Sequence, residues 1–448
     1  MQSPTQARDT AAALVERAIK AGATAADAVY IGDRSDSVSV RMGALEGVSS
    51  SEGEEIGLRV FVGQRSASVA SSALTPDALA ALAERALAMA GEAPEDPFAG
   101  LAPAELLLTG EPVEFDRFDP TEVDPAALKA RALEAEAAAL AVPRITNSGG
   151  ASASASASIV AIATSTGFAA ASRSSGHGVS ASVVAGAAGA LQRDYDYDSA
   201  RFLDDLEDAA AIGRRAGERA AARLGPVKLQ PGRMAVLFDP RVATSLLGHF
   251  AGAITASGVA RKASFLMDKL GERIFAPGIV IRDDPHRARG LRSRAFDGEG
   301  LPTIARNLVD DGVLTTWLAE AASARQLGIA PTGHAVRGTS GAPGAVPGNL
   351  YLEAGSCTPE QLLAAHPRAL LITELIGMGV NGVTGDYSRG AAGFLVEHGA
   401  IVGPVAEITI AANLIDMFAS LEPGSDLSLR RGIDSPTILI PEMMVAAS

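Results

Sequence analysis

The sequence predicts an α+β protein in which an N-terminal α+β region with mixed or antiparallel sheets is followed by a β-rich C-terminal domain. Three observations support this prediction. The first half alternates helical patterns with short strand patterns, whereas the second half, from about Gly232, is rich in glycine and in short strands. The length of 448 residues also exceeds that of a usual single hydrophobic core, so more than one domain is expected.

Residues 1–92 form the first predicted subdomain, a small α+β unit. Its first helix covers residues 10–21 and has Asp9 as its N-cap. A second helix begins after Thr75, followed by a proline in its first turn, and ends at Gly91. Four strand patterns lie between the two helices, at residues 28–31, 37–41, 57–62 and 64–71.

Residues 93–123 are expected to be a linker because they are rich in proline, glutamate and aspartate. The second predicted subdomain, residues 124–226, begins with a helix near Asp124 and closes with another over 204–224. Between them, residues 149–158 alternate alanine with serine. A period of two with small side chains indicates closely stacked antiparallel strands rather than disorder.

Residues 227–448 form the predicted β-rich domain. Strand patterns occur at 233–238, 278–281 and 369–376. A short helix is predicted at Thr358, where a glutamine three residues later completes a capping box.

Composition limits the possible partners. Lysine and arginine number 38 against 52 acidic residues, a net charge of −14 that repels phosphate, so no nucleic-acid partner is expected. The most basic stretch, residues 282–294, also holds two aspartates and reads as a solvated loop. No segment has the uninterrupted apolar length of a membrane span or the apolar core of a secretion signal, and the single cysteine fits a reducing compartment. A cytoplasmic location without membrane contact is therefore expected.

The histidines do not form a local metal motif. The chain has six, and no two lie within five positions of each other, so the His-Glu-x-x-His arrangement of zinc proteases is absent from the sequence. His249 lies at the edge of the apolar stripe of a predicted helix that begins at Asp239, and it is expected to pack rather than to bind a metal.

Three further patterns are interpreted as structural. Residues 377–382 match the Gly-x-Gly-x-x-Gly fingerprint of dinucleotide sites, but no helical pattern follows, so no cofactor is expected. The three aspartates of residues 194–198 are predicted to share one face of a solvated strand end. Cys357 is predicted to pack as a small apolar side chain.

The segment 384–394 differs in kind from these patterns. Asp386, Tyr387, Ser388 and Arg389 are flanked by glycines that permit tight turns, which makes them a candidate peptide-binding or partner-binding loop. A turn that satisfies only its own hydrogen bonds stays open as an alternative.

This segment, with Glu-Ile-Thr-Ile-Ala-Ala-Asn-Leu at 407–414, resembles the C-terminal signature of the TldD/PmbA family of modulator proteases. Further family motifs follow in the same order: Phe-Asp-Gly-Glu-Gly at 296–300, Asp-Gly-Val-Leu at 311–314 and Thr-Gly-His-Ala-Val-Arg at 332–337. The resemblance covers nearly the whole chain and is strongest from 232 to 417.

The resemblance has a specific implication for metal binding. The TldD kind of subunit carries His-Glu-x-x-x-His before a basic pair, and residues 261–262 look like that pair. Counting back places Gly248, His249 and Ala253 at the motif, so both ligand positions are degenerate. The family's cysteine ligand near the C-terminus also has no counterpart, because the tail contains none.

The chain is therefore similar to the PmbA, or TldE, kind of subunit. The resemblance implies no catalytic, cofactor-binding or metal-binding residue in this chain, and zinc in a TldD-like metalloprotease partner. Together the two subunits would degrade or mature unfolded peptides.

Two alternatives stay open. A self-sufficient metallopeptidase with an unrecognised site would bring His249 together with His334 or His398. A homo-oligomeric regulatory or binding protein, such as a homodimer of this chain, would need no TldD-like subunit.

Overall fold

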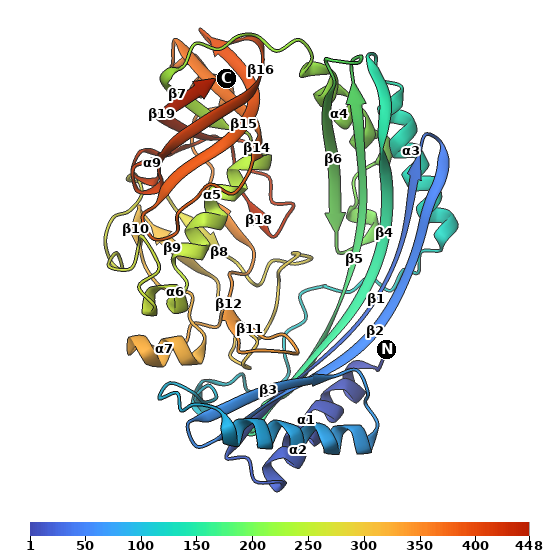
Figure 1. Ribbon diagram of the computed structural model, residues 1–448, viewed down its shortest axis with the longest axis vertical. Coiled ribbons are helices and arrows are strands. Elements are labelled where there is room, and N and C mark those ends of the chain that lie inside the picture. Colours follow the sequence, from blue (N-terminus) through green and yellow to red (C-terminus); the bar gives the residue numbers. More distant parts are fainter. Residues whose placement is uncertain (448) are drawn as a thin grey trace.

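The computed structural model describes residues 1–447 and consists of a long curved sheet that faces a C-terminal domain (Figure 1). Helix accounts for 24% and strand for 38% of the chain, and the C-terminal part is rich in strands, which confirms the predicted fold class.

The N-terminal sheet contains six antiparallel strands in the order β3-β2-β1-β4-β5-β6. Because β1 pairs with β4 along most of its length, a single sheet runs through both predicted subdomains, 1–92 and 124–226. The strands are β1 (Ala25–Arg41), β2 (Ala44–Val62), β3 (Arg65–Ser71), β4 (Ile145–Thr164), β5 (Ala169–Ala185) and β6 (Gln192–Ala200).

Several strands are longer than the sequence patterns suggested. The patterns at 28–31 and 37–41 both belong to β1, which continues through the polar residues between them because β2 and β4 pair with it on either side. The alanine and serine alternation does form a strand, as predicted, within β4. Its serines meet hydroxyls of β5, with oxygens 2.9 Å apart in the pair Ser152 and Ser180.

Helices cover the outer face of this sheet at its two ends (Figure 1). One end carries α1 (Pro4–Lys20) and α2 (Pro76–Glu92), and the other carries α3 (Pro125–Leu140) and α4 (Ala209–Ala222). The predicted start of the first helix at Asp9 is wrong. The helix begins at Pro4, with Ser3 as its N-cap. The Ser3 side chain forms a capping box with Gln6, which satisfies free amides at this earlier start.

The C-terminal domain is built on a small closed sheet. Its strands follow the order β16-β15-β14-β7-β19, and β16 also pairs with β19, which closes the ring. They are β7 (Gly232–Phe238), β14 (Arg368–Ile376), β15 (Asp386–Glu397), β16 (Ala400–Asn413) and β19 (Ile438–Ala447), with the short β17 (Glu422–Pro423) beside β19.

Shorter elements complete this domain. A five-stranded sheet contains β10 (Val313–Leu314), β9 (Arg306–Asp310), β8 (Ile281–Asp283), β13 (Leu350–Leu352) and β18 (Ile433–Asp434). The pair β11 (Ala335–Val336) and β12 (Gly344–Ala345) lies nearer the long sheet. The helices are α5 (Pro240–Ala253), α6 (Ala256–Ala260), α7 (Ala321–Leu327), α8 (Pro359–Ala364) and α9 (Leu414–Ser420), and single 3-10 turns occur at Ala104–Leu106 and Leu203–Asp205.

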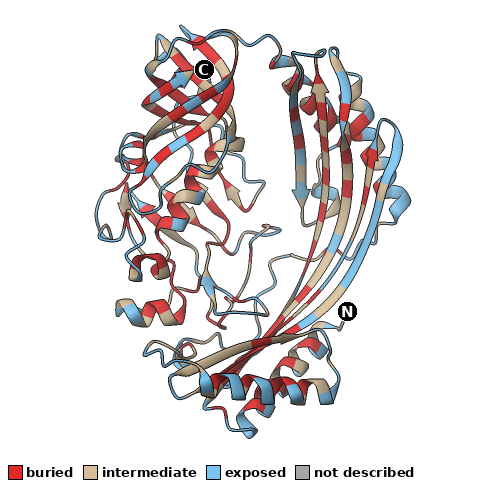
Figure 2. Ribbon diagram, viewed as in Figure 1, coloured by how far each residue is buried: buried red, intermediate tan, exposed pale blue. Residues whose placement is uncertain are grey.

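The largest hydrophobic core of the described residues lies in the C-terminal domain, where buried residues line the closed sheet and its helices (Figure 2). Phe250 of α5 packs edge-on against Phe275, and Phe275 stacks on Phe418 with ring centres 4.6 Å apart. This core fixes the position of α5 against the strands. The predicted bounds of the strand at 278–281 are wrong, because strand pairing begins only at Ile281, the first residue of β8.

A buried ion-pair cluster joins the long sheet to the C-terminal domain. Asp27 of β1 accepts hydrogen bonds from Arg59 of β2 and from Arg337, which follows β11. Close backbone contact supports the same junction. A Cβ on Gly57 of β2 would lie 2.0 Å from the carbonyl oxygen of Thr339, so only glycine fits there.

Candidate functional site

Helix α5 carries the positions that the sequence comparison placed at a metal motif. It follows β7 directly and begins with Asp239, whose carboxylate caps the helix, and Pro240 at its first turn. The helix buries Leu246 and Phe250 against the core. His249 is half-buried one residue earlier, at the edge of the apolar stripe as predicted.

The two degenerate ligand positions lie near the end of this helix. Gly248 is exposed, and a Cβ built on it would meet no atom within 4 Å. Ala253 is buried at the last turn. Neither residue has a side-chain donor atom, and among residues 1–447 no three His, Cys, Asp or Glu side chains gather in a way that could hold a metal ion. The residues present here therefore do not fit the zinc that the family motif implies.

The predicted loop of Asp386, Tyr387, Ser388 and Arg389 is a strand, so its assignment as a loop is wrong. These residues are the first four of β15 and pair with Asn413 to Ile410 of β16. The glycine-rich turn predicted from the sequence lies just before them, at residues 382–385. Tyr387 and Arg389 are buried while Asp386 and Ser388 are exposed, which is the period of two expected of a strand.

The buried face of β15 meets α5. The rings of His249 and Tyr387 lie edge to face with centres 6.1 Å apart. Burial, and next the charge of Arg389, lower the pKa of His249, so the neutral ring is favoured. Burial raises the pKa of Tyr387, which stays a neutral phenol. The structure thus brings one metal-motif residue together with two residues of the predicted binding segment.

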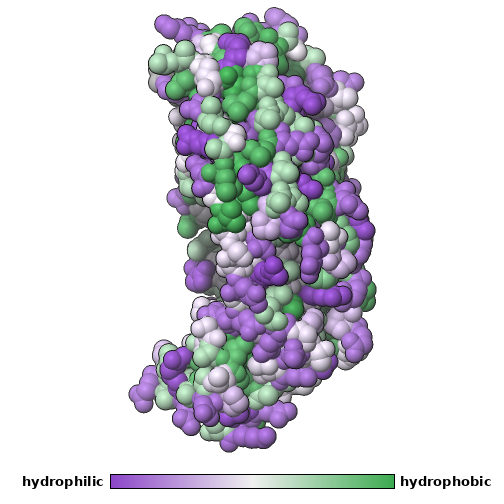
Figure 3. Space-filling model, turned by 90° about the vertical axis from the view of Figure 1, so that its right-hand side faces the viewer, coloured by the Kyte–Doolittle hydropathy of each residue, from purple (hydrophilic) through white to green (hydrophobic). Residues whose placement is uncertain are grey.

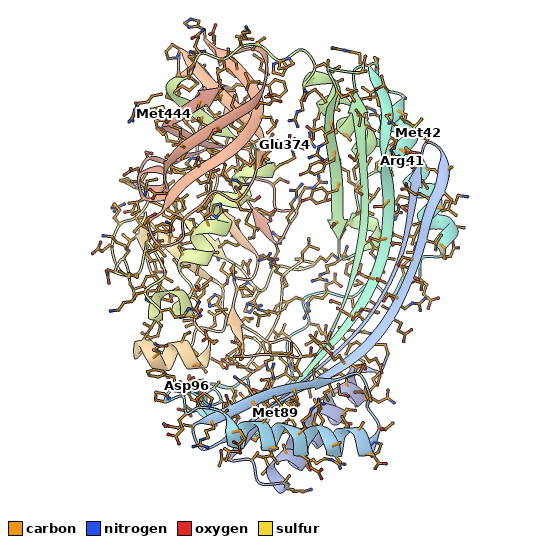
Figure 4. All side chains as sticks on the ribbon, in the orientation of Figure 1. Arg41, Met42, Met89, Asp96, Glu374 and Met444 are labelled. Atoms are coloured by element: carbon orange, nitrogen blue, oxygen red, sulfur yellow. The ribbon has the colours of Figure 1, made fainter. Side chains whose placement is uncertain are left out.

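Next to these residues a pocket of about 360 Å³ separates the C-terminal domain from the long sheet. It is lined by α5, β14 and the start of β15 on one side and by β6 and the end of α4 on the other. Figure 4 places Glu374 of β14 at this junction. The lining residues are Arg193, Asp194, Tyr195, Arg223, Arg241, Val242, Ser245, Thr373, Glu374, Leu375 and Arg389.

The aspartates of β6 do share one strand face, but the prediction that this face is solvated is wrong. Asp194 and Asp196 are each only 4% exposed. The covering side chains are arginines, spaced four residues apart along α4 and just beyond its end. Two of them, Arg215 and Arg219, each donate to Asp196 at 2.7 Å. Burial is possible because these guanidinium groups neutralise the carboxylates.

The remaining histidines have separate surroundings. His334 is buried and contacts Asp283 at 3.0 Å and Thr332 at 2.7 Å. His398 occupies the turn between β15 and β16, where its amide donates to the carbonyl of Pro367. None of these partners is a partner of His249.

Two other sequence patterns are placed by the structure. Residues 377–382 lie in the connection between β14 and β15, so the element that follows them is a strand and not a helix. Cys357 is exposed, so its predicted packing as an apolar side chain is wrong. It lies just before the capped helix α8, where little of the chain covers it.

Sequence reasoning missed most of the pocket. Arg223, Arg241 and Glu374 come from three elements that are far apart in the chain, and no local motif links them. The basic stretch 282–294 was read as solvated, yet Arg287 pairs with the buried Asp434 at 3.2 Å and Arg294 hydrogen-bonds the carbonyl of Val346.

Three domain families match the chain. Residues 26–90 match PmbA/TldA metallopeptidase domain 1, residues 118–224 match the central domain and residues 231–447 match the C-terminal domain. A protein of Escherichia coli O157:H7 named Metalloprotease PmbA is 40% identical over 92% of this chain and 89% of its own length. A Metalloprotease PmbA homolog of Haemophilus influenzae is 36% identical over 97% of this chain and 94% of its own.

Solved structures share the whole fold. A Bacteroides thetaiotaomicron protein described as a modulator of DNA gyrase superposes with a TM-score of 0.90, at 26% identity, over 98% of this chain and 99% of that chain. TldE from Thermococcus kodakarensis superposes with a TM-score of 0.85 over 97% of this chain and 99% of that chain, and at 20% identity it shows the fold alone. With three matching domains and close relatives along nearly its full length, this chain belongs to the PmbA/TldD family.

Proposed function

We propose that this chain is a PmbA/TldE-type subunit of a two-component metallopeptidase that degrades or matures unfolded peptides, and that it is not catalytic by itself. The observation that carries the proposal is the local chemistry of α5. At the two ligand positions of the family motif stand Gly248 and Ala253, which offer no donor atom, within an otherwise complete family fold.

The surroundings of α5 also disfavour a metal. A catalytic zinc ion takes three protein ligands and a water molecule. Here His249 is the one imidazole near the motif, and its neighbours are Tyr387 and the positively charged Arg389. A guanidinium group repels a divalent cation, so this arrangement supports a site of another kind.

The zinc chemistry then belongs to a TldD-like partner subunit. An exposed apolar turn beside the candidate site supports such a contact. Ile376, Met378 and Val383 are 54%, 82% and 57% exposed, although they surround the turn that leads into β15. Apolar side chains gathered at one exposed place often mark an interface with another protein.

A second exposed apolar group occurs on the β1–β2 hairpin, whose tip is marked by Met42 in Figure 4. Met42, Leu45 and Val48 are each about half exposed or more. On this side of the molecule, hydrophobic surface gathers in the upper part of Figure 3. Both groups are available for heteromeric assembly or, in the chain alone, for a homodimer.

The proposed compartment is the cytoplasm. Within residues 1–447, every helix is too short or too polar to cross a bilayer. The formal charge of −14 supports peptide and protein partners over nucleic acid.

A mixing experiment tests this proposal. The purified chain, a purified TldD-like subunit and their mixture are each assayed for hydrolysis of an unfolded peptide, and complex formation is followed by native mass spectrometry. We expect a heteromeric species and hydrolysis in the mixture, and no hydrolysis by this chain alone. Hydrolysis by this chain alone, with bound zinc, would overturn the proposal.

The apolar turn provides a matched pair of variants for the same experiment. Met378→Glu places a charge in the proposed interface and is expected to weaken complex formation at least about tenfold. Val113→Glu places the same charge at another exposed position, 65% exposed, and is expected to leave the complex intact.

A further inference from the structure

The pocket between β6 and α5 contains an unusual arrangement of charges. Asp194 contacts Arg241 at 3.0 Å and Arg223 at 3.4 Å. Glu374 contacts Arg223 and, at 3.5 Å, Arg193. The three arginines thus form ion pairs with two carboxylates. Asp239, 3.6 Å from Arg241, supplies a third negative charge. These side chains neutralise one another.

Arg389 is the exception in this pocket. Arg389 is only 9% exposed, and it lines the pocket from the start of strand β15. Among residues 1–447 its guanidinium group has no ion pair, and its buried Nε has no hydrogen-bond partner. Burying a charged group without a partner costs several kcal/mol by general estimates, so a fold does not gain stability from such a residue.

Neutral polar groups near Arg389 also lack partners. The hydroxyl of Thr373, which lines the pocket, is buried without a hydrogen bond. The hydroxyl of Tyr387 and the Nε2 of His249 are likewise buried and unpaired in the layer beside Arg389. Buried polar atoms are normally satisfied, and the unpaired atoms of Thr373 and Arg389, which both line this pocket, indicate a site that a ligand completes.

The charge balance selects the kind of ligand. A guanidinium group presents paired donors that match the two oxygens of a carboxylate. Because only Arg389 lacks a counter-charge, the pocket has room for one negative charge. A phosphate dianion would bring a second negative charge close to Asp194 and Glu374. A volume of about 360 Å³ admits more than a bare anion and lies within the range of small-molecule sites.

We propose that this pocket binds the carboxylate of a short peptide, with Arg389 as the paired donor and the Thr373 hydroxyl as an additional hydrogen-bonding group. Val242 and Leu375, which also line the pocket, would contact the apolar part of the ligand. The identification of the ligand as a peptide rests on the proposed function, whereas the carboxylate chemistry rests on the pocket alone.

Direct binding to the full chain tests this proposal. Three fluorescein-labelled alanine tripeptides are compared by fluorescence anisotropy: one with a free C-terminal carboxylate, one with a C-terminal amide, and one amide whose last residue is glutamate. EDTA in the buffer prevents metal-dependent hydrolysis, so the result does not depend on whether this chain is a peptidase. We expect the free acid to bind at least about tenfold more tightly than the alanine amide.

The glutamate peptide distinguishes a terminal from a side-chain carboxylate. Binding as tight as that of the free acid would identify a side-chain carboxylate as sufficient, and binding as weak as that of the amide would identify the peptide terminus. Either result supports the proposal provided that one carboxylate peptide binds more tightly than the alanine amide. Equal affinity for all three peptides, or tighter binding of inorganic phosphate in competition, would overturn it.

Substitution assigns the effect to Arg389. Arg389→Gln should weaken the binding of the carboxylate peptide at least about tenfold and leave the affinity for the alanine amide unchanged. Arg233→Gln is the matched control, because Arg233 is an exposed arginine of β7 paired with the exposed Glu442 outside the pocket. Circular dichroism confirms that each variant is folded. Unchanged carboxylate affinity in a folded Arg389→Gln protein would contradict the proposal.

Discussion

Two sets of buried arginines differ in how they are neutralised. At the junction of the long sheet with the C-terminal domain, Arg59 and Arg337 both donate to Asp27, and Glu299 lies 3.7 Å from Arg59. In the pocket beside α5, Arg389 is buried to a similar degree and pairs with no carboxylate of the described residues.

The difference indicates two roles for the same side chain. Asp27 and Arg59 are direct cross-strand neighbours in β1 and β2, and Arg337 reaches them from the other domain. Such a cluster holds two parts of the fold in one arrangement. An arginine without a counter-charge adds no such support, and its location in a pocket fits the binding of an anion.

The largest expected effect follows from removing the shared carboxylate of the junction. Asp27→Asn keeps the size of the side chain but removes the carboxylate that Arg59 and Arg337 share, so that Arg59 retains Glu299 alone and Arg337 loses its ion pair. We expect the free energy of unfolding to fall by about 3–5 kcal/mol, measured by urea denaturation.

An ion pair with an exposed arginine and a partly buried aspartate serves as the control for this variant. Arg34 and Asp36 contact each other at 3.4 Å near the middle of β1, where the arginine is exposed. Asp36→Asn should change the free energy of unfolding by less than about 1 kcal/mol. If both variants lower the free energy of unfolding by the same amount, the junction cluster contributes no more to stability than an ordinary ion pair.

The pH dependence of stability gives a second test of the junction. Burial raises the pKa of Glu299 from 4.5 to about 7. Between these values the folded state binds the proton more tightly than the unfolded state, so stability falls as pH rises from about 4.5 to 7 and then levels off. The expected loss is about 3 kcal/mol.

Glu299→Gln removes this titration and should flatten the profile of unfolding free energy against pH over that window. Asp297, whose pKa burial also raises, is present in both proteins, and its charge contributes to the raised pKa of Glu299. The difference between the two profiles therefore reports Glu299 together with this coupling. A variant whose profile matches that of the original protein would show that Glu299 titrates normally.

The smallest expected effect concerns the pocket. Arg389→Met keeps the apolar stem that packs near Tyr387 and removes the unpaired charge. We expect the free energy of unfolding to stay within about 1 kcal/mol of the original value or to rise. A loss as large as that of Asp27→Asn would show that Arg389 has a structural partner.

The sequence predicted the fold class and most helices, because caps such as Thr75 and Asp124 are local signals, and the structure confirms both. It did not predict that β1 joins two subdomains into one sheet. That pairing involves residues more than 100 positions apart, and strand register depends on neighbours that a local pattern does not reveal.

The candidate site was only partly predictable. The segment containing Arg389 was identified from its residue types and from the family resemblance, but its strand conformation and its contact with α5 depend on tertiary packing. The burial of Asp194 depends on an arginine just after α4 and on one in α5, which lie 29 and 47 positions away. The sequence therefore predicted a solvated strand face at Asp194, whereas the fold covers this face with arginine side chains.

We propose that this member of the PmbA/TldD family lacks metal chemistry of its own at α5. The most direct measurement is the zinc content of the purified chain after reconstitution with zinc and removal of the excess, together with a peptide hydrolysis assay. We expect no stoichiometric zinc in this chain and no hydrolysis until a TldD-like subunit is added. One zinc ion per chain with hydrolysis in the absence of a partner would contradict it.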